Sequence, residues 1–316
     1  MPEDVDFPLP YLATSILFMV STFGFVISFY LLVKFLTRKG RLSSFQKLCL
    51  AKTFPNVIVC SSFLLWVIPL SIIQPLEVSR LPNVVVGQVA GAGAYIMGTV
   101  ICSPIFIGQF SGPLIQLCMS ANRCFILYFP LKNYIVDKRS STNLAISVAI
   151  IVSIIFTCVG LPDECGYIYD PKVFTWTSES YSCAEFQLNV LLCSVFTLAI
   201  MSNSLNFITA MKLLFCNSFE LGMNQAYTSR RRRRRIMMFI QNVVQDCLHM
   251  VDLINCIYIS LLSNDLWFQF TFLTLSFVLV YALDGLVMFH FHPELQPKFM
   301  RRRQTSIACK PVFTVL

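Results

Sequence analysis

Long apolar runs dominate the chain, and their lengths predict helices that cross a lipid bilayer. A helix needs about 20 apolar residues to cross the hydrocarbon core. The runs of roughly this length or longer are residues 11–36, 48–73, 84–129, 142–161, 187–215, 236–262 and 268–291. The polar connections between them are too short for a separate soluble domain. The pattern therefore predicts an all-α, polytopic membrane protein built as a seven-transmembrane helix bundle.

Composition supports this class and excludes others. The chain is 56% hydrophobic and only 13% charged, with a mean hydropathy of +0.69, whereas soluble domains carry about 25% charged residues. The 13 cysteines lie mostly inside apolar runs, without a CxxC or His/Cys cluster. We expect no metal site and no cofactor. A nucleophile motif or phosphate loop is also missing, so the chain is not expected to be an enzyme.

The distribution of charge predicts the orientation. Lys and Arg near helix ends are retained in the cytosol. With the amino terminus outside, 22 of the 24 basic residues fall on the cytosolic side, Lys52 among them, and only Arg80 and Lys172 lie outside. We expect residues 1–10 to be extracellular, 11–291 to form the bundle and 292–316 to be a cytosolic tail with a short amphipathic helix at 294–303. The net charge of +8 then reflects the topology of the chain and does not indicate nucleic-acid binding.

The third apolar run is long enough for two crossings. Two crossings, however, would place the six arginines at 230–235 outside and invert the helices that follow. One crossing is therefore predicted. The surplus segment, residues 97–112, is rich in Gly and Pro, and both a re-entrant segment and an insertion remain open for it.

A short motif stands at the cytosolic end of this run. It reads Ser-Ala-Asn122-Arg123-Cys, and Pro130 follows seven residues after the arginine. This motif resembles the Asp/Glu-Arg-Tyr motif and downstream proline of rhodopsin-like receptors, with Asn122 in place of the acid. The resemblance implies that Arg123 contacts a G protein in the active state. The alternative is an arginine that snorkels to the membrane surface.

Several pieces along the chain together resemble the nematode serpentine receptor class X family. They are the Asn-Arg pair with Phe129-Pro130, the outer-loop stretch 165–183, the sequence QNVVQD at 241–246, and YALDG at 281–285. The resemblance implies a G-protein-coupled chemosensory receptor for an unidentified small external ligand, either a small molecule or a peptide. It further implies a heterotrimeric G protein as partner and a plasma-membrane location, with a sensory-neuron cilium as one candidate.

Two cysteines, Cys165 and Cys183, lie in the predicted second outer loop, an oxidising environment. The family resemblance includes both cysteines and favours a disulfide between them. Cys102 is an alternative partner, because rhodopsin-like receptors usually join this loop to the third helix.

The sixth apolar run carries a polar stripe. At 100° per residue, Gln241, Gln245, His249 and Asp252 fall within about 80° of arc, and Asn242 and Asp246 flank them. Such a stripe must face the bundle interior. One hypothesis is a hydrated network that rearranges on activation, and another is a set of protonated acids that only pack helices together. The predicted network residues are Asn56, Gln245, Asp246, His249 and Asp284.

A ligand pocket is expected between the outer halves of the third, fifth, sixth and seventh helices. The candidate lining residues, chosen by depth and chemistry, are Trp66, Asn189, Tyr258, Trp267 and Phe272. The alternative function is a proton-coupled transporter or channel that uses the intramembrane acids. The lack of internal repeats and the odd number of crossings weigh against it.

Overall fold

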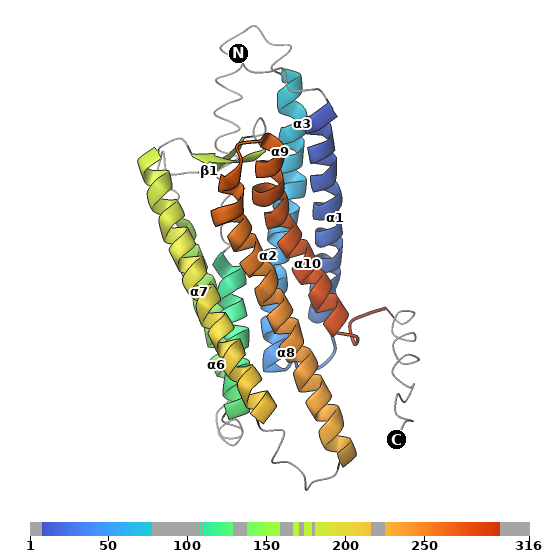
Figure 1. Cartoon of the computed structure of the whole chain (residues 1–316). Helices are drawn as coiled ribbons and strands as arrows, with labels where there is room; N and C mark the ends of the chain where they lie inside the picture. The colour runs from blue at the N-terminus through green and yellow to red at the C-terminus, as the bar shows by residue number, and fades with distance from the viewer. Residues whose placement is uncertain are drawn as a thin grey trace, which may run out of the picture.

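The computed structural model describes residues 8–77, 108, 110–128, 138–158, 167–170, 174–178, 181–215 and 225–297. In these ranges the chain is a bundle of long helices with one short β-hairpin at one end (Figure 1). The predicted helical class is therefore observed. The hairpin is a correction to the purely all-α prediction, and it arises where the polar outer-loop stretch folds back on itself.

The helices agree closely with the apolar runs. They are α1 Pro8–Leu36, α2 Ser44–Ser62, η1 Phe63–Val67, α3 Ile68–Glu77, a helix at 110–128, α6 Lys138–Cys158, α7 Tyr181–Phe215, α8 Gln225–Ile254, η3 Asn255–Ile259, η4 Ser260–Leu262, α9 Leu266–Gln269, η5 Phe270–Leu275 and α10 Ser276–Phe291. The segments η1, η3 and η5 are π-helical, and η4 is a 3₁₀ turn. Most of the surplus segment 97–112 lies outside the described residues.

Local signals in the sequence set two of the helix starts. Ser43 caps α2 in a reciprocal box with Gln46, in which each side chain bonds the other residue's backbone N–H, at 3.3 Å and 3.1 Å. Asp265 caps α9 by accepting a bond from the Phe268 N–H at 3.0 Å. These caps bind backbone donors that the helix itself leaves unpaired.

The helices pack closely around α1 and α10. α1 lies against α2 and α10, α10 also contacts α8, and α7 contacts α8. Gly24 on α1 makes one of these close approaches possible, because a Cβ there would lie 2.7 Å from the Cys60 sulfur and 2.8 Å from the Ala282 Cβ. A larger residue would push α1 away from both neighbours.

The outer surface of the bundle is apolar, as lipid contact requires. Among the described residues, four helices are long and apolar enough to cross a membrane, at Tyr11–Leu36, Ser44–Ile72, Leu192–Leu213 and Leu266–Phe291, and a shorter apolar helix spans Ser141–Ile155. On α6 the exposed side chains recur every three or four residues, at Leu144, Val148, Ile151 and Ile155. This stripe faces away from the protein and fits a lipid-facing surface.

Inside the bundle, two apolar clusters lie at opposite ends. The first, at what we call the loop end, surrounds the α1–α2 loop and is built on Phe35, Leu48, Met119 and Met288. The second, at the hairpin end, is built on Leu17, Phe63, Phe270 and Val278. Between them, the buried positions of α2 and α10 become polar, which creates a polar layer across the middle of the bundle.

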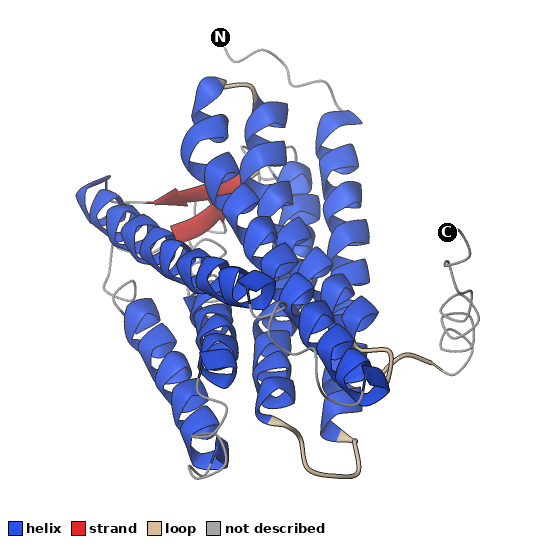
Figure 2. Ribbon diagram, turned by 60° about the horizontal axis from the view of Figure 1, so that its bottom comes forward, coloured by secondary structure: helices blue, strands red, loops and turns tan. Residues whose placement is uncertain are grey.

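The hairpin closes the second end. Strands β1 Tyr167–Asp170 and β2 Thr175–Ser178 pair antiparallel, and β2 contacts η5. Tyr169 and Phe174 are buried within the second cluster. The hairpin therefore lies among the helix ends and not beyond them (Figure 2).

The chain turns back after α10 and docks on the loop end. Glu294 contacts the His292 ring at 3.2 Å, the Arg38 guanidinium at 4.0 Å and the Gln46 amide at 3.5 Å. The described part of the predicted amphipathic helix, residues 294–297, is a turn and bend. Its remainder lies outside the described residues.

This docking contact predicts a dependence of stability on pH. The hydrogen bond from His292 and the nearby Arg38 charge lower the pKa of Glu294 from 4.5 to about 2, although partial burial opposes the shift. A lowered folded-state pKa gives stability that is present above pH 4.5 and is lost as the pH falls toward 2. Because a partly exposed pair contributes at most about 1 kcal/mol, we expect the melting midpoint to fall by roughly 2–4 °C.

The measurement is thermal unfolding of the purified protein between pH 6 and pH 3, beside Glu294→Gln. The variant should melt lower at pH 6 and lose this part of the acid dependence. An unchanged difference between the two proteins across the range would contradict the assignment.

Candidate functional site

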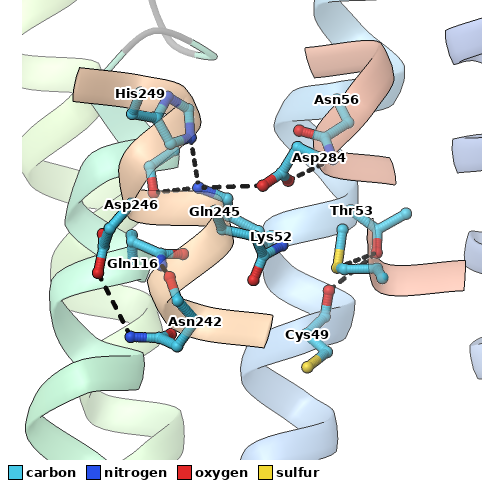
Figure 3. A network of polar contacts seen from close by, with 12 residues as sticks. Cys49, Lys52, Thr53, Asn56, Gln116, Asn242, Gln245, Asp246, His249 and Asp284 are labelled. Carbon is cyan, nitrogen blue, oxygen red and sulfur yellow. Dashed lines mark hydrogen bonds and ion pairs between the residues drawn. The ribbon is translucent and has the colours of Figure 1, made fainter. Parts of the chain in front are cut away.

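Lys52 is the centre of the polar layer. Its ammonium group lies 2.9 Å from the His249 Nε2, 3.2 Å from the Gly112 carbonyl oxygen and 4.0 Å from the Asp284 Oδ1 (Figure 3). The side chain is fully buried. One cation on α2 thus joins the helix at 110–128, α8 and α10.

Asp284 is held from two sides. The Asn56 amide donates to its Oδ2 at 2.7 Å, and the Lys52 ammonium faces its Oδ1. Asn56 and Asp284 are both fully buried. Because a buried carboxylate is costly unless it is paired and hydrogen-bonded, this arrangement explains how Asp284 is accommodated at this depth.

His249 completes this group, which we call the Lys52 cluster. Its Nε2 accepts the bond from the lysine when the ring is neutral, with the ring proton then on Nδ1. The ring also meets Tyr281 edge-on, with the centroids 6.1 Å apart. His249 therefore ties α8 to both α2 and α10.

A second polar group surrounds Asp246. The Ser202 hydroxyl lies 3.0 Å from both carboxylate oxygens, and the amides of Asn206 and Asn242 also donate to the carboxylate. The Asn242 amide further donates to Ser120 at 2.7 Å. This Asp246 cluster links the helix at 110–128, α7 and α8.

The predicted single network is thus two clusters in the structure. Asp246 is bonded to residues of α7 and α8, and no described hydrogen bond joins it to Asn56 or Asp284. The reason is helical geometry, because Asp246 lies 100° around α8 from its neighbour Gln245 and about 60° from His249. The two faces of one stripe therefore meet different helices.

The polar stripe of α8 does face the interior. Gln241, Asn242 and Gln245 are fully buried, and Val244 and Val251 on the opposite side are exposed. Gln241 donates to Gln245 at 3.5 Å. Nearer the hairpin end, the Ser276 hydroxyl donates to Asp252 at 2.9 Å and accepts from Asn255 at 2.9 Å, which ties α8 and η3 to α10.

The sequence-based prediction of site residues does not include Lys52. Its assignment to the basic residues at the cytosolic helix ends is wrong, because the side chain lies inside the bundle. The signal was present in the spacing, since Lys52 shares a helix face with Leu48, Cys49, Asn56 and Val59, all of them buried.

Arg123 lies at the loop end, near the end of the helix at 110–128. Its guanidinium carbon is 4.5 Å from the centre of the Phe45 ring. All three guanidinium nitrogens, like the Asn122 amide nitrogen, are buried without a hydrogen-bond partner among the described residues. Pro130, the third residue of the motif, lies outside the described residues.

The expected pocket residues separate into two groups. Trp66 and Trp267 pack against the cluster at the hairpin end, and Phe272 is half-buried beside Phe268, with ring centroids 4.6 Å apart. Tyr258 is 64% exposed and Asn189 is also exposed. Neither of these two lines the interior, which corrects that part of the prediction.

The reason for the outward position of Tyr258 is again periodicity. On a helix of regular pitch, the nine residues from His249 to Tyr258 would turn the side chain about 180° from the interior face, and the side chain is exposed. The depth of a residue in the membrane does not determine the direction of its side chain.

The disulfide prediction falls largely on residues outside the described ranges. Cys165 and Cys102 lie there, and Cys183 is in the first turn of α7 with no description of its side chain. Within the described ranges, no group of three or more His, Cys, Asp or Glu side chains could hold a metal ion.

Apolar helix surfaces outside and a polar layer inside define a multi-pass helical membrane protein. Comparison with known protein families matches residues 18–292 to the family described as serpentine type 7TM GPCR chemoreceptor Srx. The match covers most of the chain, so the protein belongs to this family, as the motifs predicted. Comparison with curated proteins gives no match. The family supports a receptor role and does not favour the transporter or channel alternative.

Proposed function

We propose that the protein is a G-protein-coupled chemosensory receptor of the plasma membrane. In this proposal it crosses the membrane seven times, with residues 1–10 outside, 11–291 in the bundle and 292–316 in the cytosol. A small external ligand binds at the hairpin end. The partner at the loop end is a heterotrimeric G protein, and a sensory cilium is the location we expect.

The observation that carries this proposal is that the Arg123 guanidinium has no hydrogen-bond partner among the described residues, in a chain that belongs to the Srx family. A buried charged donor without a partner is costly. Backbone carbonyls at the end of a partner helix, or its carboxylate, would supply the missing acceptors. The neighbouring loop carries Arg38, Lys39 and Arg41, which agrees with a cytosolic loop end.

The polar layer offers a connection between the two ends. The Lys52 cluster and the Asp246 cluster share α8, and each joins it to different helices. A movement of α8 would therefore exchange several hydrogen bonds together. We propose that Asn56, Gln245, Asp246, His249 and Asp284, with Lys52, rearrange on activation.

The ligand end is supported by irregular helices. The π-helical segments η1, η3 and η5 all lie on the side of the polar layer away from Arg123, and η3 contacts η5. Such segments occur frequently at functional sites. Trp66, Trp267 and Phe272 lie in or beside these segments and remain our candidates for the pocket wall.

Replacing Arg123 by alanine tests the proposal. The full chain and a heterotrimeric G protein are reconstituted in lipid vesicles, and basal guanine-nucleotide exchange is measured without added ligand. We expect exchange above that of vesicles lacking the receptor, and a loss of about tenfold or more in Arg123→Ala, because a charge-assisted hydrogen bond contributes about 1.5–3 kcal/mol.

The matched control is Lys212→Ala. Lys212 also stacks on an aromatic ring, that of Tyr128 at 4.4 Å, and should be replaceable without loss of exchange. Equal exchange by Arg123→Ala and the unaltered chain, at equal amounts of folded protein, would refute the role of Arg123.

A further inference from the structure

The hairpin carries two aromatic residues, Tyr169 and Phe174, into the end of the bundle, and Phe174 is the one that contacts η5 through both its ring and its backbone carbonyl. The side chain is only 6% exposed. Its ring meets Phe270 edge-on with centroids 5.8 Å apart, and its backbone carbonyl accepts a hydrogen bond from the Thr274 hydroxyl. Both partners belong to η5, so successive turns of one helix receive a phenyl ring and a carbonyl group.

The backbone of Phe174 is in an unusual conformation. Its φ is 52°, in the left-handed region that residues other than glycine rarely adopt. Such strain persists only where surrounding contacts outweigh it. The contacts with Phe270 and Thr274 therefore hold the hairpin in a conformation from which it would relax if they were replaced.

We propose that Phe174 is a built-in occupant of the ligand site, and that the external ligand replaces it. The ligand would be a small uncharged molecule with an aromatic ring separated by two carbons from a carbonyl group, the spacing found in Phe174 itself. Its ring would pack on Phe270 and its carbonyl would accept from Thr274, both of them neutral. This inference rests on the proposed receptor function and names the ligand class of that site.

The site has a direct connection to α8. Ser276, the first residue of α10, follows Thr274 by two residues in the same continuous helix. Its hydroxyl donates a hydrogen bond to the Asp252 carboxylate at 2.9 Å. The Trp267 ring also lies edge-on to Phe270, with centroids 5.7 Å apart. A change in what η5 binds therefore acts on residues that position α8.

Binding of benzylacetone to Phe174→Gly tests the proposal. This compound has the required ring, two-carbon spacing and ketone. Glycine removes the ring of residue 174 and tolerates its positive φ, so the ligand then competes only with the backbone carbonyl of residue 174 for the Thr274 hydroxyl. The full chain is purified in lipid nanodiscs, and binding is measured by calorimetry. Because the unaltered chain must first release its own occupant, we expect at least about tenfold tighter binding to the variant.

Matched compounds and a second substitution separate the two contacts. In the Phe174→Gly background, Thr274→Val should weaken the binding of benzylacetone about fivefold, because the hydrogen bond to its ketone is lost. The affinity for butylbenzene, which has no ketone, should not change. Thr274→Ser should keep the affinity for benzylacetone. Equal affinity of benzylacetone for the unaltered chain and Phe174→Gly, or an equal loss for both compounds in Thr274→Val, would overturn the proposal.

A measurement on the unaltered chain covers the case in which the variant does not fold. Saturating benzylacetone should accelerate hydrogen exchange at the amides of the hairpin strands, because the hairpin is displaced. Unchanged or slower exchange there would overturn the proposal. None of these readouts needs a G protein, so the ligand inference and the receptor proposal, tested by Arg123→Ala, can fail separately.

Discussion

Replacing Lys52 by methionine is expected to lower the free energy of unfolding by about 3–5 kcal/mol, the cost of leaving one partner of a buried ion pair alone. The substitution keeps most of the side-chain volume but removes the cation that faces Asp284 and the donor to His249. The carboxylate would then remain in the polar layer without a facing cation, hydrogen-bonded to the Asn56 amide.

The double variant Lys52→Met/Asp284→Leu distinguishes a charge effect from a packing effect. Exchange of a whole buried pair for apolar residues is often neutral or stabilising, so the double variant should recover most of the loss. Stability is measured by denaturant unfolding in mixed micelles. Lys34→Met is the control, since Lys34 is exposed on α1 and should change stability by no more than about 0.5 kcal/mol.

Two results would contradict this interpretation. A Lys52→Met protein as stable as the unaltered chain would mean that the pair contributes nothing. A double variant less stable than both single variants would mean that the lysine acts through packing and not through its charge.

Replacing Asp246 by leucine is expected to cost about 3 kcal/mol or more. The carboxylate is the acceptor for Ser202 and for the amides of Asn206 and Asn242. Each buried donor left without an acceptor costs about 1–3 kcal/mol, and the neighbouring bond to Ser120 can relieve only part of this.

Asp246→Asn is the matched comparison. It keeps the shape and one carbonyl acceptor, so a loss of about 1 kcal/mol is expected from the weaker, neutral hydrogen bonds. Unfolding of both variants is measured under the same conditions as for Lys52. If the asparagine variant were as unstable as the leucine variant, the negative charge, and not the hydrogen-bonded geometry, would hold the cluster together.

Helical periodicity predicted which α8 side chains of the candidate site face the interior, but it did not predict which other helices they contact. The interior direction of Gln241, Gln245 and Asp246 follows from a regular helix of 3.6 residues per turn. The contact between Asn56 and Asp284 could be expected because both are polar residues at similar depths. Depth along the helix does not by itself give the direction of a side chain, and Tyr258 on η3 points outward.

The sequence by itself determined the class of the protein, the positions of its helices and the family. These properties depend on the lengths of apolar runs and on short local motifs, both of which can be read along one chain. Only the tertiary structure decided which helices each polar side chain joins, that Lys52 is buried opposite Asp284, and that Phe174 enters the helix bundle. Such contacts depend on the rotation and approach of separate helices, which the packing of many side chains sets together.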